Sequence, residues 1–294
     1  MTLILITGAA SPLGEAVGRA FQALGIRADG TIRLNGKKPQ PGLFSELISL
    51  DLANQAEYLS LDKNYDAVVH IASRVEGSTS DIFNSTGLST AFLIDRMLQL
   101  KVPTLVHVSS MAVYGPITSD QVDANSPIRH SSVFGAAKWS AECFVANAHP
   151  SIAGVSVRSP AIVGARSHRH FLANSIARMI KGSPVIELLN PDFMSNNLIH
   201  EDSLAAFLAH LALHPPASYR AFPVSSGSPM ALRSVVERLR EVTRYRGRIE
   251  WSMSSIPPFS IVPDQAVELG FKPLTMAETL ERWIKDLDYL TTRT

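Results

Sequence analysis

A turn rich in small residues follows the first apolar run and could bind phosphate groups. The run Leu3–Ile6 leads into Thr7-Gly8-Ala9-Ala10-Ser11-Pro12-Leu13-Gly14, after which a helix is expected. Backbone amides and the positive end of a helix dipole can meet a pyrophosphate at such a turn. Ser11 replaces the middle glycine of the pattern T-G-x-x-G-x-x-G, so an ordinary turn before a helix is the alternative. The residues predicted to line a dinucleotide site here are Gly8, Ala10, Ser11, Pro12, Leu13 and Gly14.

Three further polar segments follow apolar runs and could reach the same ligand. They are Asp51-Leu52, His70-Ile71-Ala72-Ser73 and Ser109 to Gly115. Ligands of open α/β sheets lie beyond the carboxyl ends of the strands. We therefore expect Asp51 and Leu52 to lie near an adenine ring, and Ala72 and Ser73 to line the cofactor site.

The elements that must position these segments alternate between strands and helices, which indicates βαβ units and a parallel sheet. Strands are expected at 3–6, 31–34, 47–50, 67–71, 104–108 and 155–157, and helices at 14–24, 88–100 and 134–147. Proline pairs and a Ser/Gly cluster mark a looser second half. We predict a dinucleotide-binding domain over 1–160, with a later contribution near 195–214, and a mostly substrate-binding lobe over 161–294.

The composition excludes several classes of protein. The 294 residues include 27 basic and 26 acidic residues, and 46% are hydrophobic, which excludes intrinsic disorder and disfavours a nucleic-acid partner. The single cysteine, Cys143, allows no internal disulfide and predicts a reducing, cytoplasmic compartment. No uncharged apolar run approaches the roughly 18 residues of a membrane span, so no membrane partner is expected. His70 and His200 lack a spaced ligand cluster, and no metal site is predicted.

Together the segments resemble the extended short-chain dehydrogenase/reductase family of NAD(P)-dependent epimerases, dehydratases and reductases. The likeness covers nearly all of the chain and extends to Asn84 with Gly87, 158–164, 197–202 and 264–273. It implies an α/β fold with a Rossmann-type doubly wound parallel sheet and a smaller C-terminal substrate lobe. It also implies that Pro160 lies at the cofactor, that the substrate is a small molecule, and that helices 88–100 and 134–147 pair in a homodimer.

The resemblance further implies three catalytic positions. Family members use a Tyr-x-x-x-Lys pair, in which the lysine lowers the pKa of a tyrosine general acid/base, and a serine or threonine that polarises the substrate carbonyl. The matching segment here runs from Ser132 to Lys138, with Phe134 in place of the tyrosine, and Ser110 matches the hydroxyl. The catalytic positions are therefore Ser110, Phe134 and Lys138, and Lys138 also binds the nicotinamide ribose.

Phenylalanine keeps the ring and loses the proton, and general acid/base catalysis contributes roughly 10² to 10⁴ in rate. Three explanations are open. Tyr114, Ser132 or a bound water supplies the proton; or the chain is a natural non-catalytic relative; or the chain is a tyrosine-to-phenylalanine variant of a working enzyme.

Charge after the second strand predicts the cofactor. NAD enzymes usually place an acidic residue there, whereas an arginine accommodates the 2′-phosphate of NADP. The segment 31–38 has no carboxylate and carries Arg33, Lys37 and Lys38. We expect NADP(H) to be preferred and NAD(H) to be possible, with ordinary loop cations as the alternative.

The sequence says least about the substrate. Two arginines that clamp a diphosphate in nucleotide-sugar members are missing, and Asn196 stands at one of their positions. Tyr114, Asn196, Arg166 and Arg169 are the predicted substrate residues. The two arginines are named because they belong to a basic loop that follows Gly164 and could meet a phosphate or carboxylate. An ordinary solvated loop is an alternative of equal weight.

The predicted function is an NADP(H)-dependent oxidoreductase or epimerase. It transfers hydride at a carbonyl or carbinol carbon of a sugar-like or other small substrate, and Phe134 is expected to impair its activity. The alternative is a catalytically silent NADP(H)-binding sensor or scaffold.

Overall fold

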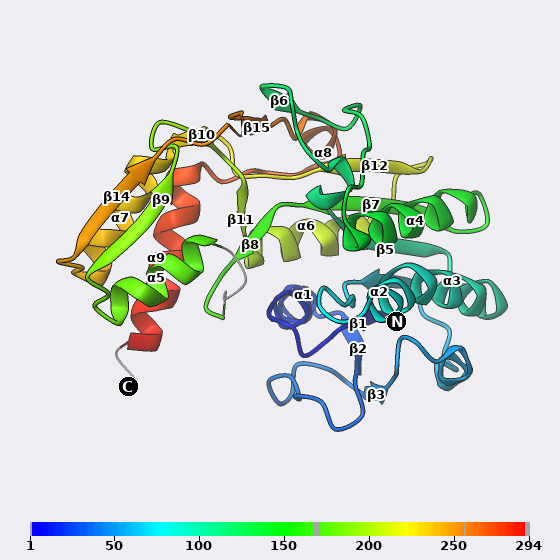
Figure 1. Ribbon diagram of the computed structural model, residues 1–294. Coiled ribbons are helices and arrows are strands. Elements are labelled where there is room, and N and C mark those ends of the chain that lie inside the picture. The colour runs from blue at the N-terminus through cyan, green and yellow to red at the C-terminus, as the bar shows by residue number, and fades with distance from the viewer. Residues whose placement is uncertain (1, 167–170, 256, 292–294) are drawn as a thin grey trace.

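A seven-stranded parallel sheet organises the protein (Figure 1). The computed structural model describes residues 2–166, 171–255 and 257–291. Strand order is β12-β7-β5-β4-β1-β2-β3, so the order reverses between β1 and β4. The strands are β1 (Leu3–Thr7), β2 (Arg27–Ile32), β3 (Leu47–Ser49), β4 (Ala67–His70), β5 (Thr104–Ser110), β7 (Ala153–Ser159) and β12 (Arg220–Pro223). The predicted α/β class with a Rossmann-type sheet is confirmed.

Helices cover both faces of the sheet because successive strand residues point to opposite sides. Ile4 and Ile6 pack with α1 (Pro12–Ala23) and α6 (Glu201–Leu213) in one buried cluster. Leu5 packs on the other face, in a cluster with α3 (Ser89–Leu100) and α4 (Val133–Asn147). Short α2 (Thr79–Phe83) and the π-helical turn η2 (Asn84–Leu88) lead into α3. The remaining short elements of this half are η1 (Gln55–Ser60), η3 (Met111–Tyr114) and β6 (Gln121–Val122).

A third buried cluster forms around Trp283, which is fully buried. Two parallel strand pairs frame it: β8 (Ala161–Val163) with β11 (Leu198–His200), and β9 (Val185–Leu189) with β14 (Arg248–Ser252). The helices are α5 (Phe171–Ile180), α7 (Leu232–Thr243) and α9 (Met276–Thr291). The small elements are β10 (Met194–Ser195), β13 (Met230–Ala231), β15 (Ser260–Ile261) and α8 (Asp264–Glu268). β15 pairs with β6, which joins this half to the loop that follows η3.

The second strand differs from its prediction, and a buried charge explains why. The expected strand began at Thr31, but β2 starts at Arg27 and includes Asp29 and Gly30, both poor strand formers. The fully buried Asp29 carboxylate forms an ion pair with Lys63 Nζ at 2.6 Å. A Cβ atom at Gly30 would overlap the Ala9 side chain, so glycine is needed where β2 passes the first turn.

The strand β12 was not predicted. Only four residues long, it forms the edge of the sheet beside β7 and ends at Pro223, where a missing amide is tolerated. Among the described residues, no helix is both long and apolar enough to cross a membrane.

Candidate functional site

The turn after β1 has the geometry that a dinucleotide pyrophosphate needs. Gly8 adopts φ +74°, and a Cβ atom there would lie 3.1 Å from Ala72 Cα. A Cβ atom at Gly14 would overlap the Gly8 carbonyl, so glycine allows the closest part of the turn. Ser11 caps α1: its Oγ accepts a hydrogen bond from the Gly14 amide at 3.0 Å and donates to the Gly8 carbonyl at 2.8 Å. The serine that interrupts the glycine pattern is thus a helix N-cap, and the turn fits the cofactor.

Thr7 joins the ends of β1 and β4 beside this turn, a role that was not predicted. Its Oγ1 accepts hydrogen bonds from the amides of Ile71 (3.1 Å) and Ala72 (3.2 Å) and lies 2.7 Å from His70 Nδ1. Burial and the nearby charge of Lys138 lower the pKa of His70 to about 3. His70 is therefore a neutral structural group. In the described part of the chain, no three His, Cys, Asp or Glu side chains are arranged to hold a metal ion.

The residues expected near the adenosine half lie at the adjacent strand ends. Arg33 follows β2 and is exposed, as are Lys37 and Lys38. Asp51 follows β3, where its amide donates to Glu57 Oε2 at 2.6 Å and its Oδ1 accepts from the Ala53 amide at 3.0 Å. These local bonds hold the Asp51 turn in place, and the half-buried Leu52 follows it.

The three predicted catalytic positions lie at the end of β5 and the start of α4. Ser110 is half-buried, and its Oγ accepts from the Ala112 amide at 3.1 Å, which caps η3. Phe134 is half-buried in the first turn of α4, after the N-cap Ser132, whose hydroxyl accepts from the Gly135 amide. This capping bond uses an acceptor site of the Ser132 hydroxyl and leaves its own hydrogen free, so Ser132 stays open as a proton donor.

Lys138 is only 3% exposed, and its Nζ donates to the Val108 carbonyl at 2.7 Å. Nζ lies 5.8 Å from the centre of the Phe134 ring. Burial lowers the pKa of Lys138 to about 7, and the nearby Glu142 carboxylate opposes this shift. A solvated surface lysine, the alternative for this position, is excluded by the burial.

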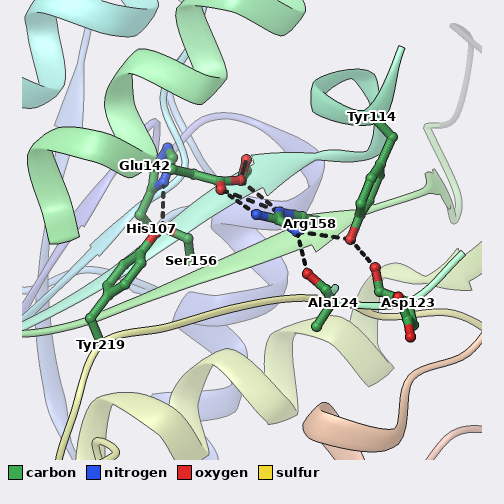
Figure 2. A network of polar contacts seen from close by, with 9 residues as sticks. His107, Tyr114, Asp123, Ala124, Glu142, Ser156, Arg158 and Tyr219 are labelled. Atoms are coloured by element: carbon green, nitrogen blue, oxygen red, sulfur yellow. Dashed lines mark hydrogen bonds and ion pairs between the residues drawn. The ribbon is translucent and has the colours of Figure 1, made fainter. Parts of the chain in front are cut away.

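A buried polar network lies behind these residues (Figure 2). Arg158 on β7 makes a bidentate ion pair with Glu142 on α4, at 2.8 Å between Nη2 and Oε2 and 3.0 Å between Nε and Oε1. Ser109 Oγ donates to Glu142 Oε1 at 2.5 Å. Arg158 Nη1 donates to the Tyr114 hydroxyl at 2.9 Å and to the Ala124 carbonyl at 3.3 Å. The network connects β5, η3, α4 and β7, and sequence analysis did not identify it.

Two of the predicted substrate residues have interior roles instead. Tyr114 is 2% exposed, and its hydroxyl donates to the Asp123 carbonyl at 2.7 Å in the same network. Burial raises its pKa to about 12, so Tyr114 is a poor replacement for a catalytic tyrosine. Asn196 is 3% exposed and pairs with both backbone groups of Ile261 at 2.8 Å, which holds β15 in place. These contacts correct the expectation that Tyr114 and Asn196 face a substrate.

The basic loop after β8 is described only in part. Arg166 Nη2 forms an ion pair with Glu15 Oε2 at 2.8 Å, over the first turn of α1. Arg169 lies outside the described residues. Pro160 is half-buried at the end of β7, directly before β8.

Solved structures with the same fold share little sequence with this chain. The UDP-Glc/GlcNAc 4-epimerase from Campylobacter jejuni has a TM-score of 0.84 at 18% identity, with 100% of each chain covered. The UDP-glucuronic acid 4-epimerase from Bacillus cereus in complex with NAD has a TM-score of 0.83 at 17% identity, covering 98% of this chain and 99% of that one. MoeE5 in complex with UDP-glucose and NAD has a TM-score of 0.81 at 22% identity, with 98% and 99% covered.

At these identities the neighbours establish the fold alone. A search of curated proteins finds no significant match. The family model for the NAD dependent epimerase/dehydratase family matches residues 4–218, which is more than half of the chain. The sequence-based family prediction is therefore confirmed, and the protein belongs to the NAD dependent epimerase/dehydratase family.

Proposed function

We propose that the protein binds a nicotinamide dinucleotide and promotes hydride transfer at a carbonyl or carbinol carbon of a sugar-like or other small substrate. The observation that carries the proposal is the convergence of the Gly8 turn, Ser110 and Lys138 at the carboxyl ends of neighbouring strands. This edge contains the point between β1 and β4 where the strand order reverses, and open α/β sheets bind their ligands at such points.

The chain's own residues divide the work of binding and orienting. The turn from Gly8 to Gly14 and the N-terminus of α1 hold the pyrophosphate, while Ala72, Ser73 and Pro160 line the site. The bound nicotinamide supplies or accepts the hydride. Ser110 Oγ accepts a hydrogen bond from the Ala112 amide, so the hydroxyl's own hydrogen can be donated to the substrate oxygen. Lys138 binds the nicotinamide ribose.

Phe134 limits this chemistry because its ring edge carries no ionisable oxygen. We propose that turnover is slow for this reason, by the roughly 10² to 10⁴ that general acid/base catalysis contributes. The same observation favours a second candidate function, a catalytically silent dinucleotide-binding sensor or scaffold. A working reaction on any substrate excludes the silent protein.

We propose NADP(H) as the preferred cofactor and NAD(H) as a weaker one. Support comes from the exposed cations Arg33, Lys37 and Lys38 after β2, in a segment without a carboxylate. The family model is described as NAD dependent, and two of the similar structures hold NAD, which makes a direct comparison of both dinucleotides necessary.

For the substrate we propose a small molecule of the sugar class, with Arg166 and Arg169 as candidates to meet a phosphate or carboxylate. MoeE5 was solved with UDP-glucose, which makes UDP-sugars the first compounds to test. We also propose a cytoplasmic homodimer that pairs through α3 and α4.

The test combines binding with turnover. Calorimetric titration with NADPH and NADH measures cofactor binding. NADPH oxidation is followed against ketones and keto-sugars, and conversion of UDP-sugars to their epimers is followed separately, because an epimerase returns the hydride without net oxidation. Binding with slow oxidation supports the impaired enzyme. Binding without oxidation or epimerisation by either this chain or its Phe134→Tyr variant supports the silent protein, and absence of dinucleotide binding refutes both.

A further inference from the structure

The ion pair between Glu142 and Arg158 lies one helical turn below the site. Lys138 and Glu142 are four residues apart on α4, so both lie along the same side of the helix. Each is at most 3% exposed. A buried lysine and a buried glutamate at this spacing would ordinarily form a pair, because each charge is costly to bury alone.

Arg158 prevents that pairing. It reaches Glu142 from β7 with three hydrogen bonds of 2.8 to 3.2 Å, and Ser109 donates a fourth to the same carboxylate. Figure 2 shows the guanidinium facing the carboxylate from the sheet side. Among the described residues, no carboxylate forms an ion pair with Lys138, whose Nζ donates to the neutral Val108 carbonyl.

We propose that Arg158 is a positioning residue of the site: by holding both oxygens of Glu142, it keeps that carboxylate from pairing with Lys138 and leaves the Lys138 amine available to a ligand. The inference deepens the proposed function, since Lys138 is the predicted ribose-binding and catalytic position. An amine that no carboxylate holds can donate its hydrogen bonds to a ligand hydroxyl, as a ribose-binding lysine must.

The other titratable groups around Lys138 are two buried histidines and the ion pair between Glu142 and Arg158. His70 on β4 and His107 on β5 face it, and both are fully buried with pKa values lowered by burial and by the Lys138 charge. Glu142 on α4 is the nearby carboxylate that raises the pKa of Lys138, and Arg158 on β7 lies behind Glu142. Among the described residues, Glu142 is the carboxylate whose charge opposes the lowering of the Lys138 pKa, so its pairing with Arg158 bears on Lys138.

The experiment is a titration of Lys138 by NMR in the full-length protein with ¹³C at the lysine ε-carbons. The Lys138 signal is assigned by its loss in Lys138→Met. Arg158→Met frees the Glu142 carboxylate, so the pKa of Lys138 should rise by about one unit or more, as expected for an opposite charge within a few ångströms. The double variant Arg158→Met with Glu142→Gln removes that charge and should return the pKa to near its original value. Arg158→Lys can keep part of the ion pair and should lie between.

Arg220→Met is the matched control, because Arg220 lies on β12 and makes only an exposed 3.9 Å ion pair with Glu268. It should leave Lys138 unchanged. If Arg158→Met leaves an uncompensated carboxylate and fails to fold, Glu142→Gln alone should lower the pKa of Lys138, because an unpaired Arg158 charge then faces it. Equal Lys138 titrations in all folded variants overturn the inference. The readout needs no turnover, so it stands apart from failure of the proposed reaction.

Discussion

The Lys138 Nζ atom lies 5.8 Å from the centre of the Phe134 ring, one helical turn earlier on α4. The Phe134 side chain is half-buried, and the amine of Lys138 beside it is buried. The pair therefore keeps the framework of an acid/base site in which one oxygen is missing.

Restoring that oxygen tests the framework. Phe134→Tyr should raise turnover of a reactive carbonyl compound by roughly 10² or more, because the neighbouring Lys138 lowers the pKa of a phenol while Ser110 holds the substrate oxygen. NADPH affinity should change by no more than a few-fold. NADPH oxidation by the two proteins, side by side on one panel, measures the effect.

Phe144→Tyr is the control for this comparison, since Phe144 is another partly buried phenylalanine of α4 that packs on a different cluster. It should give no gain. If Phe134→Tyr is no faster on any compound that the parent turns over, position 134 is not a vacated catalytic position.

Cofactor preference should depend on Arg33. A charged hydrogen bond contributes roughly 1.5 to 3 kcal/mol, so NADPH should bind at least several-fold more tightly than NADH. Arg33→Ala should reduce that ratio without weakening NADH, whereas Lys63→Ala, which removes a cation paired with Asp29 and Glu46, should leave the ratio unchanged. Isothermal titration of both dinucleotides into the parent and the two variants measures all six affinities, and equal binding of the two dinucleotides by the parent would show that Arg33 points elsewhere.

Burial of Lys138 should make stability depend on pH. The folded protein releases this proton near pH 7, whereas the unfolded chain keeps it until about 10.5. The unfolded state binds more protons in that window, so stability rises with pH from about 7 toward 10.5. Lys138→Met lacks this contribution, and its free energy of unfolding relative to the parent should fall by roughly 2 to 3 kcal/mol between pH 6 and 9.5. Denaturant titrations at several pH values measure it, and a pH-independent difference would contradict the burial.

Glu201 should make stability fall as pH rises, which is opposite to the effect of Lys138. It is 7% exposed at the start of α6, and burial together with Asp202 raises its pKa to about 7. The folded state then holds a proton that the unfolded chain has released above about 4.5, so this group's stabilisation is lost as pH rises toward 7. Glu201→Gln should raise the melting temperature more at pH 8 than at pH 5. The exposed Glu237→Gln on α7 should show no such trend.

The proposed homodimer is tested by sedimentation at micromolar concentration. Helices α3 and α4 lie on the same face of the sheet, and Leu98 on α3 is 44% exposed. We expect about twice the 31.9 kDa chain mass, and Leu98→Asp should shift the equilibrium toward monomer. A clean monomer for the parent protein would refute the proposal.

Local patterns in the sequence determined the strand and helix order of the first half of the chain, the tight turn at Gly8 and Gly14, and the one-turn spacing of Phe134 and Lys138. Each depends on residues close together in the chain, where backbone geometry and hydrophobic period act directly. Tertiary structure alone decided that Asp29 lies in a strand, that Asn196 hydrogen-bonds the Ile261 backbone, and that Glu142 pairs with Arg158 rather than with Lys138. These outcomes depend on burial and on partners many residues away, and a charge is tolerated inside a protein only when the whole fold brings its partner to it.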